Sequence, residues 1–112
     1  MSPRKIAELQ LIAYNNRDLD AFCDLFDKQA VLIDLPSQRV LAQGVEQIRS
    51  IYTERFALPQ LHCVVHSTSD IADFAIDKET VYGIPGGPVN IVAMYQVNND
   101  KIHRVYFIRE TE

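Results

Sequence analysis

The sequence predicts a single domain over residues 1–112 with an α+β fold, and three observations lead to this class. Before Pro59, apolar residues recur at helical spacing in three segments. After Pro59 the period changes to two, and four alternating segments follow one another. Only short turns separate these four segments, so we expect antiparallel hairpins. Helices gathered on one side of an antiparallel sheet define the α+β class, as distinct from a parallel α/β fold.

Three segments have the apolar spacing of helices. The first covers residues 4–15 and follows Pro3, a residue type common at the start of a helix. The second begins after Asp18, whose side chain can cap it. The third begins after Gly44 and stops at Leu58-Pro59, because proline cannot continue a helix. Their apolar faces are Ile6, Leu9, Ile12 and Ala13; Leu19, Phe22, Cys23 and Phe26; and Val45, Ile48, Ile51, Tyr52, Arg55 and Phe56.

Extended segments complete the predicted architecture. Residues 29–36 are typical of a strand that ends at Pro36, and residues 39–43 form a short extended piece. The sequences SDIAD, IPGGP and NND, which separate the later segments, are typical of turns. The four alternating segments cover residues 61–69, 74–83, 89–97 and 101–109.

The composition excludes several classes of partner. The chain carries a net charge of −4, and its 11 lysines and arginines are scattered instead of forming a basic stripe. We therefore expect neither nucleic acid nor an anionic membrane surface as a partner. The first residues lack the apolar core of a signal peptide, and no apolar run approaches the length of a membrane span, so we expect a cytoplasmic protein. Cys23 and Cys63 lie far apart among apolar neighbours, as reduced core cysteines do.

Three segments resemble one superfamily in their order and spacing. They are RDLDAFCDLFDKQAVLIDLP, LAQGVEQIRSIYTERF and NNDKIHRVYFI. Each is similar to a segment of the nuclear transport factor 2-like superfamily, which includes ketosteroid isomerases and SnoaL-like polyketide cyclases, and the likeness covers residues 5–109. The resemblance implies a cone-shaped, curved antiparallel sheet wrapped around three N-terminal helices, the cystatin-like α+β roll. It also implies a homodimer through the outer sheet face, to which Val92 and Met94 would contribute.

Asp34 ends an apolar segment, AVLIDLP, in which a buried carboxylate would need compensation. The resemblance places the general-base carboxylate of the isomerases on Asp34. In an apolar cavity its pKa would be raised, and it could accept a proton from carbon or water. Other interpretations stay open: an ion pair with Arg39, Arg104 or Arg109, a cap on the turn at Ser37, or simple exposure to solvent. The first interpretation predicts that Asp34→Asn abolishes turnover and leaves the melting temperature within a few degrees.

Two positions depart from the isomerase pattern. The oxyanion-donor tyrosine of the first helix aligns with Gln10, although Tyr14 lies one turn further along on the same face. The protonated acid of the penultimate strand aligns with Ala93, which can donate nothing. An enolate would then lack its second donor, so we do not expect steroid isomerisation by that mechanism.

Aromatic residues are expected to wall the cone, either filling it or lining a pocket. In the last strand, Val105, Phe107 and Arg109 share one face with His103. The family register turns this face inward, where Arg109 could meet Asp34 or an anionic ligand group, whereas a slip of one residue would turn it outward. The resemblance thus implies Asp34, Tyr14 and Arg109 as catalytic residues, and Tyr52, Phe56, Ala93, Tyr95, Val105, Phe107 and His103 as ligand-binding residues.

Histidine and acidic pairs offer further candidate sites. His62 and His66 lie four residues apart in a predicted strand, about 13 Å, which is too far for one tetrahedral zinc, so no metal site is expected. Each of these histidines, and His103, is more typical of a surface or interface than of an acid or base. Asp77 and Glu79 share a strand face; paired carboxylates can do acid–base work, but this spacing is more typical of a solvated sheet face.

The sequence therefore predicts a small protein whose apolar pocket binds a compact hydrophobic or carbonyl-bearing molecule, without metal or cofactor. In an enzyme, Asp34 would remove a proton or orient water, Tyr14 or another tyrosine would hydrogen-bond the oxyanion, and Arg109 would supply a positive field. Isomerisation, aldol cyclisation and hydration are all compatible with this site. The alternative is a non-catalytic dimeric carrier or protein-interaction module of the same fold. A ligand-sized void would favour the first interpretation, and a filled cone the second.

Overall fold

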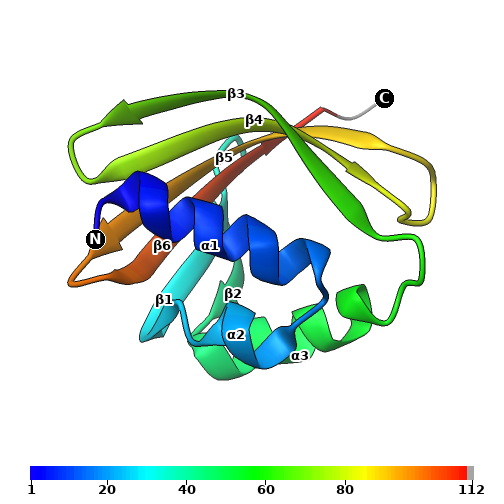
Figure 1. The fold of residues 1–112 in the computed structure, drawn as a ribbon, viewed down its shortest axis with the longest axis horizontal. Helices are drawn as coiled ribbons and strands as arrows, with labels where there is room; N and C mark the ends of the chain where they lie inside the picture. The colour runs from blue at the N-terminus through cyan, green and yellow to red at the C-terminus, as the bar shows by residue number, and fades with distance from the viewer. Residues whose placement is uncertain (111–112) are drawn as a thin grey trace.

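The computed structural model describes residues 1–110, which contain three helices and a six-stranded sheet (Figure 1). The α+β class predicted from the change of period after Pro59 is confirmed. Within the described residues, no helix combines the length and the apolar composition needed to cross a membrane. The elements are α1 (Pro3–Asn15), α2 (Leu19–Cys23), β1 (Phe26–Asp34), β2 (Arg39–Gln43), α3 (Val45–Phe56), β3 (His62–Ile71), β4 (Phe74–Tyr82), β5 (Val89–Asn98) and β6 (Lys101–Arg109).

The sheet has the strand order β2-β1-β6-β5-β4-β3. Strands β3 to β6 form the predicted antiparallel meander. The sheet is not antiparallel throughout, because β6 returns beside β1 in a parallel pair, with Leu32 opposite Val105. Strand β6, the last strand of the meander, therefore lies in the middle of the sheet, with β1 on one side and β5 on the other.

The helices cover one face of the sheet (Figure 1). Helix α1 packs against β3, β4 and β5, whereas α3 packs against β1 and β2. Helix α2 lies between the other two helices and contacts both. Residues from α1, α3 and the inner face of the sheet consequently surround a common interior.

Side-chain caps explain where α1 and α2 begin. Ser2 caps α1 by accepting a hydrogen bond from the backbone N–H of Lys5 (3.1 Å), and Asp18 caps α2 in the same way, as predicted. Helix α2 is shorter than its apolar spacing suggested, because the chain turns at Asp24 and Phe26 begins β1. Phe26 is nevertheless buried, so the pattern identified a core residue correctly and assigned it to the wrong element.

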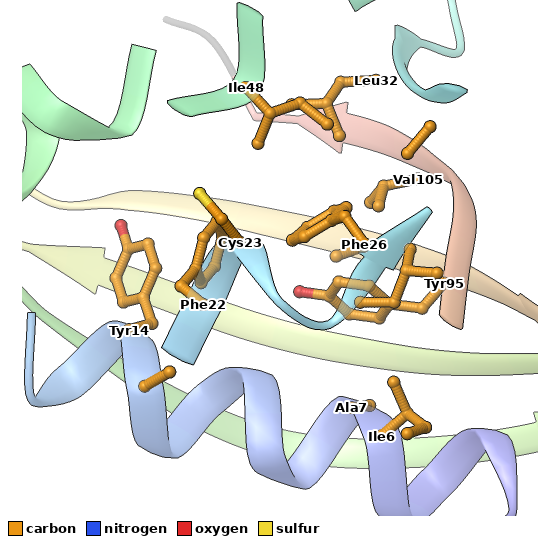
Figure 2. Close-up of a cluster of buried hydrophobic side chains, with 14 of the residues drawn as sticks. Ile6, Ala7, Tyr14, Phe22, Cys23, Phe26, Leu32, Ile48, Tyr95 and Val105 are labelled. Carbon is orange, nitrogen blue, oxygen red and sulfur yellow. The ribbon is translucent and has the colours of Figure 1, made fainter. Parts of the chain in front are cut away.

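An aromatic cluster packs around Phe22 of α2, and Figure 2 shows Tyr14, Phe22 and Phe26 of this cluster. Its centre is Phe22, which is 1% exposed and lies 4.6 Å from the ring of Tyr52 and 5.1 Å from that of Phe26, measured between centroids. Tyr14 and Phe56 complete the cluster, with their rings at right angles and 5.4 Å apart. Edge-to-face contacts of this kind add to the stabilisation from burial and hold the rings in fixed positions.

Candidate functional site

A cavity of about 280 Å³ opens between α1, α3 and the inner face of the sheet. This volume lies just below the roughly 300–1,000 Å³ of sites for drug-sized ligands, so it suits a compact molecule. Leu41 and Ile51 stand at its rim, with 37% and 39% of their surface exposed, whereas most of the other lining side chains are buried or half-buried. The lining residues are Gln10, Tyr14, Leu32, Leu41, Ile51, Tyr52, Arg55, Glu79, Val81, Ile91, Tyr95, Phe107 and Arg109.

Glu79 is the acidic side chain in the cavity wall, and it is 7% exposed. It projects from β4 on the same face as Val81, opposite Ile91 of β5. Its carboxylate oxygen accepts a hydrogen bond from the Cys63 thiol (3.3 Å), and no cation lies within 4 Å of it among residues 1–110. Burial is the main cause that raises its pKa to about 7, and the nearby Asp77 charge acts in the same direction.

The Cys63 thiol is a permanent donor to this carboxylate. Burial and the adjacent Glu79 charge raise the pKa of Cys63 well above its ordinary value, so the thiol stays protonated. The carboxyl group of Glu79 is divided between its two protonation states near neutral pH. It can therefore either accept or donate a proton inside the cavity.

Asp77 shares the inner face of β4 with Glu79 but has a different role. Arg4 of α1 donates to it at 2.5 Å and also pairs with Asp70 at 2.8 Å. Asp77 is 2% exposed and does not line the cavity. The expectation of a solvated face for Asp77 and Glu79 is therefore wrong, because this face packs beneath α1.

Three tyrosine hydroxyls accompany Glu79 in the cavity. The Tyr14 oxygen accepts a hydrogen bond from Arg55 Nη1 (3.3 Å), and burial raises the pKa of Tyr14 above its ordinary value. Burial likewise raises the pKa values of Tyr52 and Tyr95. All three phenols are thus protonated at neutral pH and available as hydrogen-bond donors. Figure 2 shows Tyr14 projecting from α1 with its hydroxyl directed away from the helix.

The structure brings together half of the residues that the sequence proposed for the site. Tyr14, Tyr52, Tyr95, Phe107 and Arg109 all line the cavity. Phe56, Ala93 and Val105 do not, because they are buried in the surrounding core and have no surface on the cavity.

Asp34 does not lie in the cavity, and the orientation predicted for it is wrong. Its carboxylate turns back over the β1–β2 turn and accepts hydrogen bonds from the backbone N–H of Ser37 (3.1 Å) and from the Ser37 hydroxyl. These bonds lower the pKa of Asp34, chiefly through the hydroxyl, which is opposite to the shift expected of a cavity base. Among the interpretations that the sequence left open, the cap on the turn at Ser37 is the one observed.

His103 also lies outside the cavity, because the β5–β6 pairing contains a bulge. Gln96 faces Arg104 and Val97 faces Ile102, which leaves His103 as the extra residue. The side chains of β6 that face inward are therefore Phe107, Val105 and Ile102. The His103 ring turns to the carbonyl oxygen of Asn98 instead, at 3.1 Å.

Sequence reasoning did not select Gln10, Arg55 or Glu79 for the site. The signal for Glu79 was present in β4, where Ala75 and Val81 flank the two acidic residues on the same face. Arg55 was predicted within the apolar face of α3, which is consistent with a charged residue at the border of a cavity. Gln10 lies on the buried face of α1, four residues before Tyr14.

Comparisons with known proteins agree with this architecture. The sequence matches the model of the SnoaL-like domain family over residues 8–105. The structure is similar to that of an uncharacterised cystatin-fold protein from Novosphingobium aromaticivorans, with 28% identity, 97% of this chain and 99% of that chain covered, and a TM-score of 0.88.

Two further solved structures share the fold. One is a proposed polyketide cyclase from Sinorhizobium meliloti, with 22% identity, 92% of this chain and 93% of that chain covered, and a TM-score of 0.79. The other is a proposed ketosteroid isomerase from Kribbella flavida, with 14% identity, 98% and 78% coverage, and a TM-score of 0.84. A search of curated proteins gave no match. Since the family model spans most of the chain, and the fold is the one that its three characteristic segments imply, this chain belongs to the SnoaL-like domain family.

Proposed function

We propose that this protein binds a compact carbonyl-bearing molecule in its cavity and transfers a proton on it, with Glu79 as the general acid–base. The observation that carries the proposal is the Glu79 carboxyl group, buried in the wall of an apolar cavity with a thiol as its hydrogen-bond donor. A carboxyl group with a pKa of about 7 is matched to proton transfer at neutral pH. Enolisation, isomerisation and aldol cyclisation all need such a group.

The neighbouring phenols supply the second requirement of this chemistry. Arg55 donates to the Tyr14 oxygen, which leaves the phenolic proton of Tyr14 free to donate to a ligand carbonyl. A donor held in this way stabilises the oxyanion that forms when Glu79 removes an adjacent proton. Gln10, on the same face of α1, offers a further amide donor to the cavity. Tyr14 and Gln10 would together supply the hydrogen bonds to the oxyanion that Ala93, at the position of the isomerases' protonated acid, cannot supply.

Deuterium exchange at carbon tests the proposal without knowledge of the natural substrate. The probe is 2-tetralone, a ketone with acidic α-protons, and exchange is followed by ¹H NMR at pD 7. The wild-type protein is expected to accelerate exchange above the buffer rate. Glu79→Gln should reduce the protein-dependent rate by about 10²-fold or more, because glutamine has the same shape and cannot take up the proton.

Asp34→Asn is the matched control, since it removes an acidic side chain that lies outside the cavity. It should leave the exchange rate unchanged. Loss of exchange in Asp34→Asn but not in Glu79→Gln would refute the assignment and restore the base that the family resemblance implied. Saturable binding of tetralone with no protein-dependent exchange would instead favour a carrier that performs no chemistry.

We also propose that the protein forms a homodimer through the outer face of the sheet. Support comes from the half-buried Val92 and Met94 on this face and from Ile108, which is 37% exposed. Phe74 and Tyr106 lie on the same side, with ring centroids 6.2 Å apart. Sedimentation equilibrium at micromolar concentration should show a dimer that Met94→Asp dissociates. A monomer at this concentration would refute the proposal.

A further inference from the structure

The cavity carries a local excess of positive charge in an acidic protein. Its lining contains one acidic residue, Glu79, and two arginines, Arg55 and Arg109, although the whole chain has a net charge of −4. Glu79 is partly neutral at physiological pH because of its raised pKa, which increases the local excess. A concave surface of one sign, opposite to the sign of the protein, attracts ligands of the opposite charge.

Neither arginine belongs to an ion pair in the described part of the chain. Among residues 1–110, no carboxylate lies within 4 Å of either guanidinium group. The side-chain hydrogen bond of Arg55 goes to the neutral Tyr14 hydroxyl. The charge of Arg109 contributes to lowering the pKa of Asp34, but the Asp34 carboxylate accepts its hydrogen bonds from Ser37. Two guanidinium groups from different elements, α3 and β6, thus line one cavity, and neither forms an ion pair within residues 1–110.

The two kinds of charge are separated within the cavity. Glu79 of β4 lies opposite Ile91 of β5, and Ile91 lies opposite Arg109 of β6, so the backbone positions of the carboxyl group and this guanidinium group are separated by a whole strand. Arg55 comes from α3 and not from the sheet. A ligand that spans the cavity would meet apolar walls along its body and different polar groups at its two ends.

We infer that the ligand is a compact carboxylate, an oxo acid with an apolar body, held by Arg55 and Arg109 with its carbonyl directed to Glu79. Guanidinium groups match the planar geometry of a carboxylate and bind it with paired, charge-assisted hydrogen bonds. This inference rests on the proposed function for the role of the carbonyl. The anion site itself stands on the two arginines and does not depend on catalysis.

Two probes of the same shape test the inference. They are 4-oxo-4-phenylbutanoate and its primary amide, which differ in charge and share the apolar body and ketone. Dissociation constants are measured by NMR titration at pH 6.5 and low ionic strength. The acid should bind at least about tenfold more tightly than the amide, and the preference should shrink as salt screens the guanidinium charges.

Arginine substitutions locate the effect. Arg55→Gln and Arg109→Gln should each reduce the preference for the acid over the amide, and the double variant should abolish it. Arg55→Lys should keep part of the preference, because it keeps the charge and loses the planar fork. Arg104→Gln on β6 is the matched control, since Arg104 is exposed and lies outside the cavity lining. It should behave as wild type.

Several results would overturn the inference. They are equal affinity for acid and amide, a preference that survives in the double variant, and the absence of binding by both probes at millimolar concentration. Each of these outcomes leaves the tetralone exchange of Glu79 untouched, so the proposed function can stand without the anion site. Conversely, a preference for the acid in a protein without Glu79-dependent exchange would support the anion site and refute the proposed proton transfer.

Discussion

Replacement of Glu79 with glutamine should change how the stability of the protein depends on pH. The pKa of Glu79 rises from an ordinary value of 4.5 to about 7 in the folded protein, mainly through burial. Folding therefore favours the protonated form. The stability that this form contributes is fully present below about pH 4.5 and is lost as the pH rises through about 7. Glutamine does not ionise, so the free energy of unfolding of Glu79→Gln does not fall in this way as the pH rises.

The size of the effect follows from the two pKa values. The difference between 4.5 and about 7 corresponds to about 3 kcal/mol at pH values above both. Between pH 5 and pH 8.5, the advantage of Glu79→Gln over the wild type should grow by about 2–3 kcal/mol. In a domain of this size, that growth shifts the melting temperature by on the order of 10 °C.

Urea unfolding followed by far-UV circular dichroism measures this difference directly. Wild type and Glu79→Gln are compared at pH 5, 6, 7 and 8.5, so that groups common to both proteins cancel. Glu8→Gln, an exposed position on α1, is the control with the same change of charge, and its difference from wild type should stay flat. A constant difference between Glu79→Gln and wild type across this range would refute the burial of an ionisable carboxyl group in the cavity.

Three further substitutions test the packing around the site by chemical denaturation. Arg4→Ala should cost about 3–5 kcal/mol, because it leaves the buried Asp77 charge without its partner; a loss below 1 kcal/mol would contradict this pairing. Phe22→Ala should cost about 3–5 kcal/mol through the cavity it leaves in the aromatic cluster, and a loss typical of a surface residue would show that the cluster is not closely packed. Gly83→Ala should destabilise far more than Gly86→Ala, although both glycines have positive φ. A Cβ at Gly83 would lie 2.1 Å from a backbone oxygen, whereas a Cβ at Gly86 would have no atom within 4 Å. Equal losses would contradict that close approach.

The elements of the fold could be predicted because local chemistry specifies them. Helix α3 begins after Gly44 and ends before Leu58-Pro59 as expected, and the four strands of the meander lie within two residues of their predicted bounds. The order of these elements, together with three segments similar to those of the superfamily, was enough to indicate the family. The parallel pairing of β1 with β6 is a long-range contact, and no local pattern indicates it.

The site was predicted less well, because it depends on which side of a strand faces inward. In β4, the alternate face with Phe74 and Ile76 is at least as apolar as the face with Ala75 and Val81, so the pattern did not identify the buried side. The pairing that neutralises Asp77 comes from Arg4, more than 60 residues away in the sequence. The prediction for Asp34 was wrong for the opposite reason, because Ser37, only three residues away, donates hydrogen bonds to its carboxylate.

The central position of β6 has a consequence for how the chain reaches its native state. Strand β1 can pair with β2 locally, but its other edge stays without hydrogen-bond partners until residues 101–109 have left the ribosome. Contacts of such long separation slow folding, because a large loop must close before they form. A nascent chain shorter than this would expose the unpaired edges of β1 and β5, where the chaperones of the cell are expected to bind.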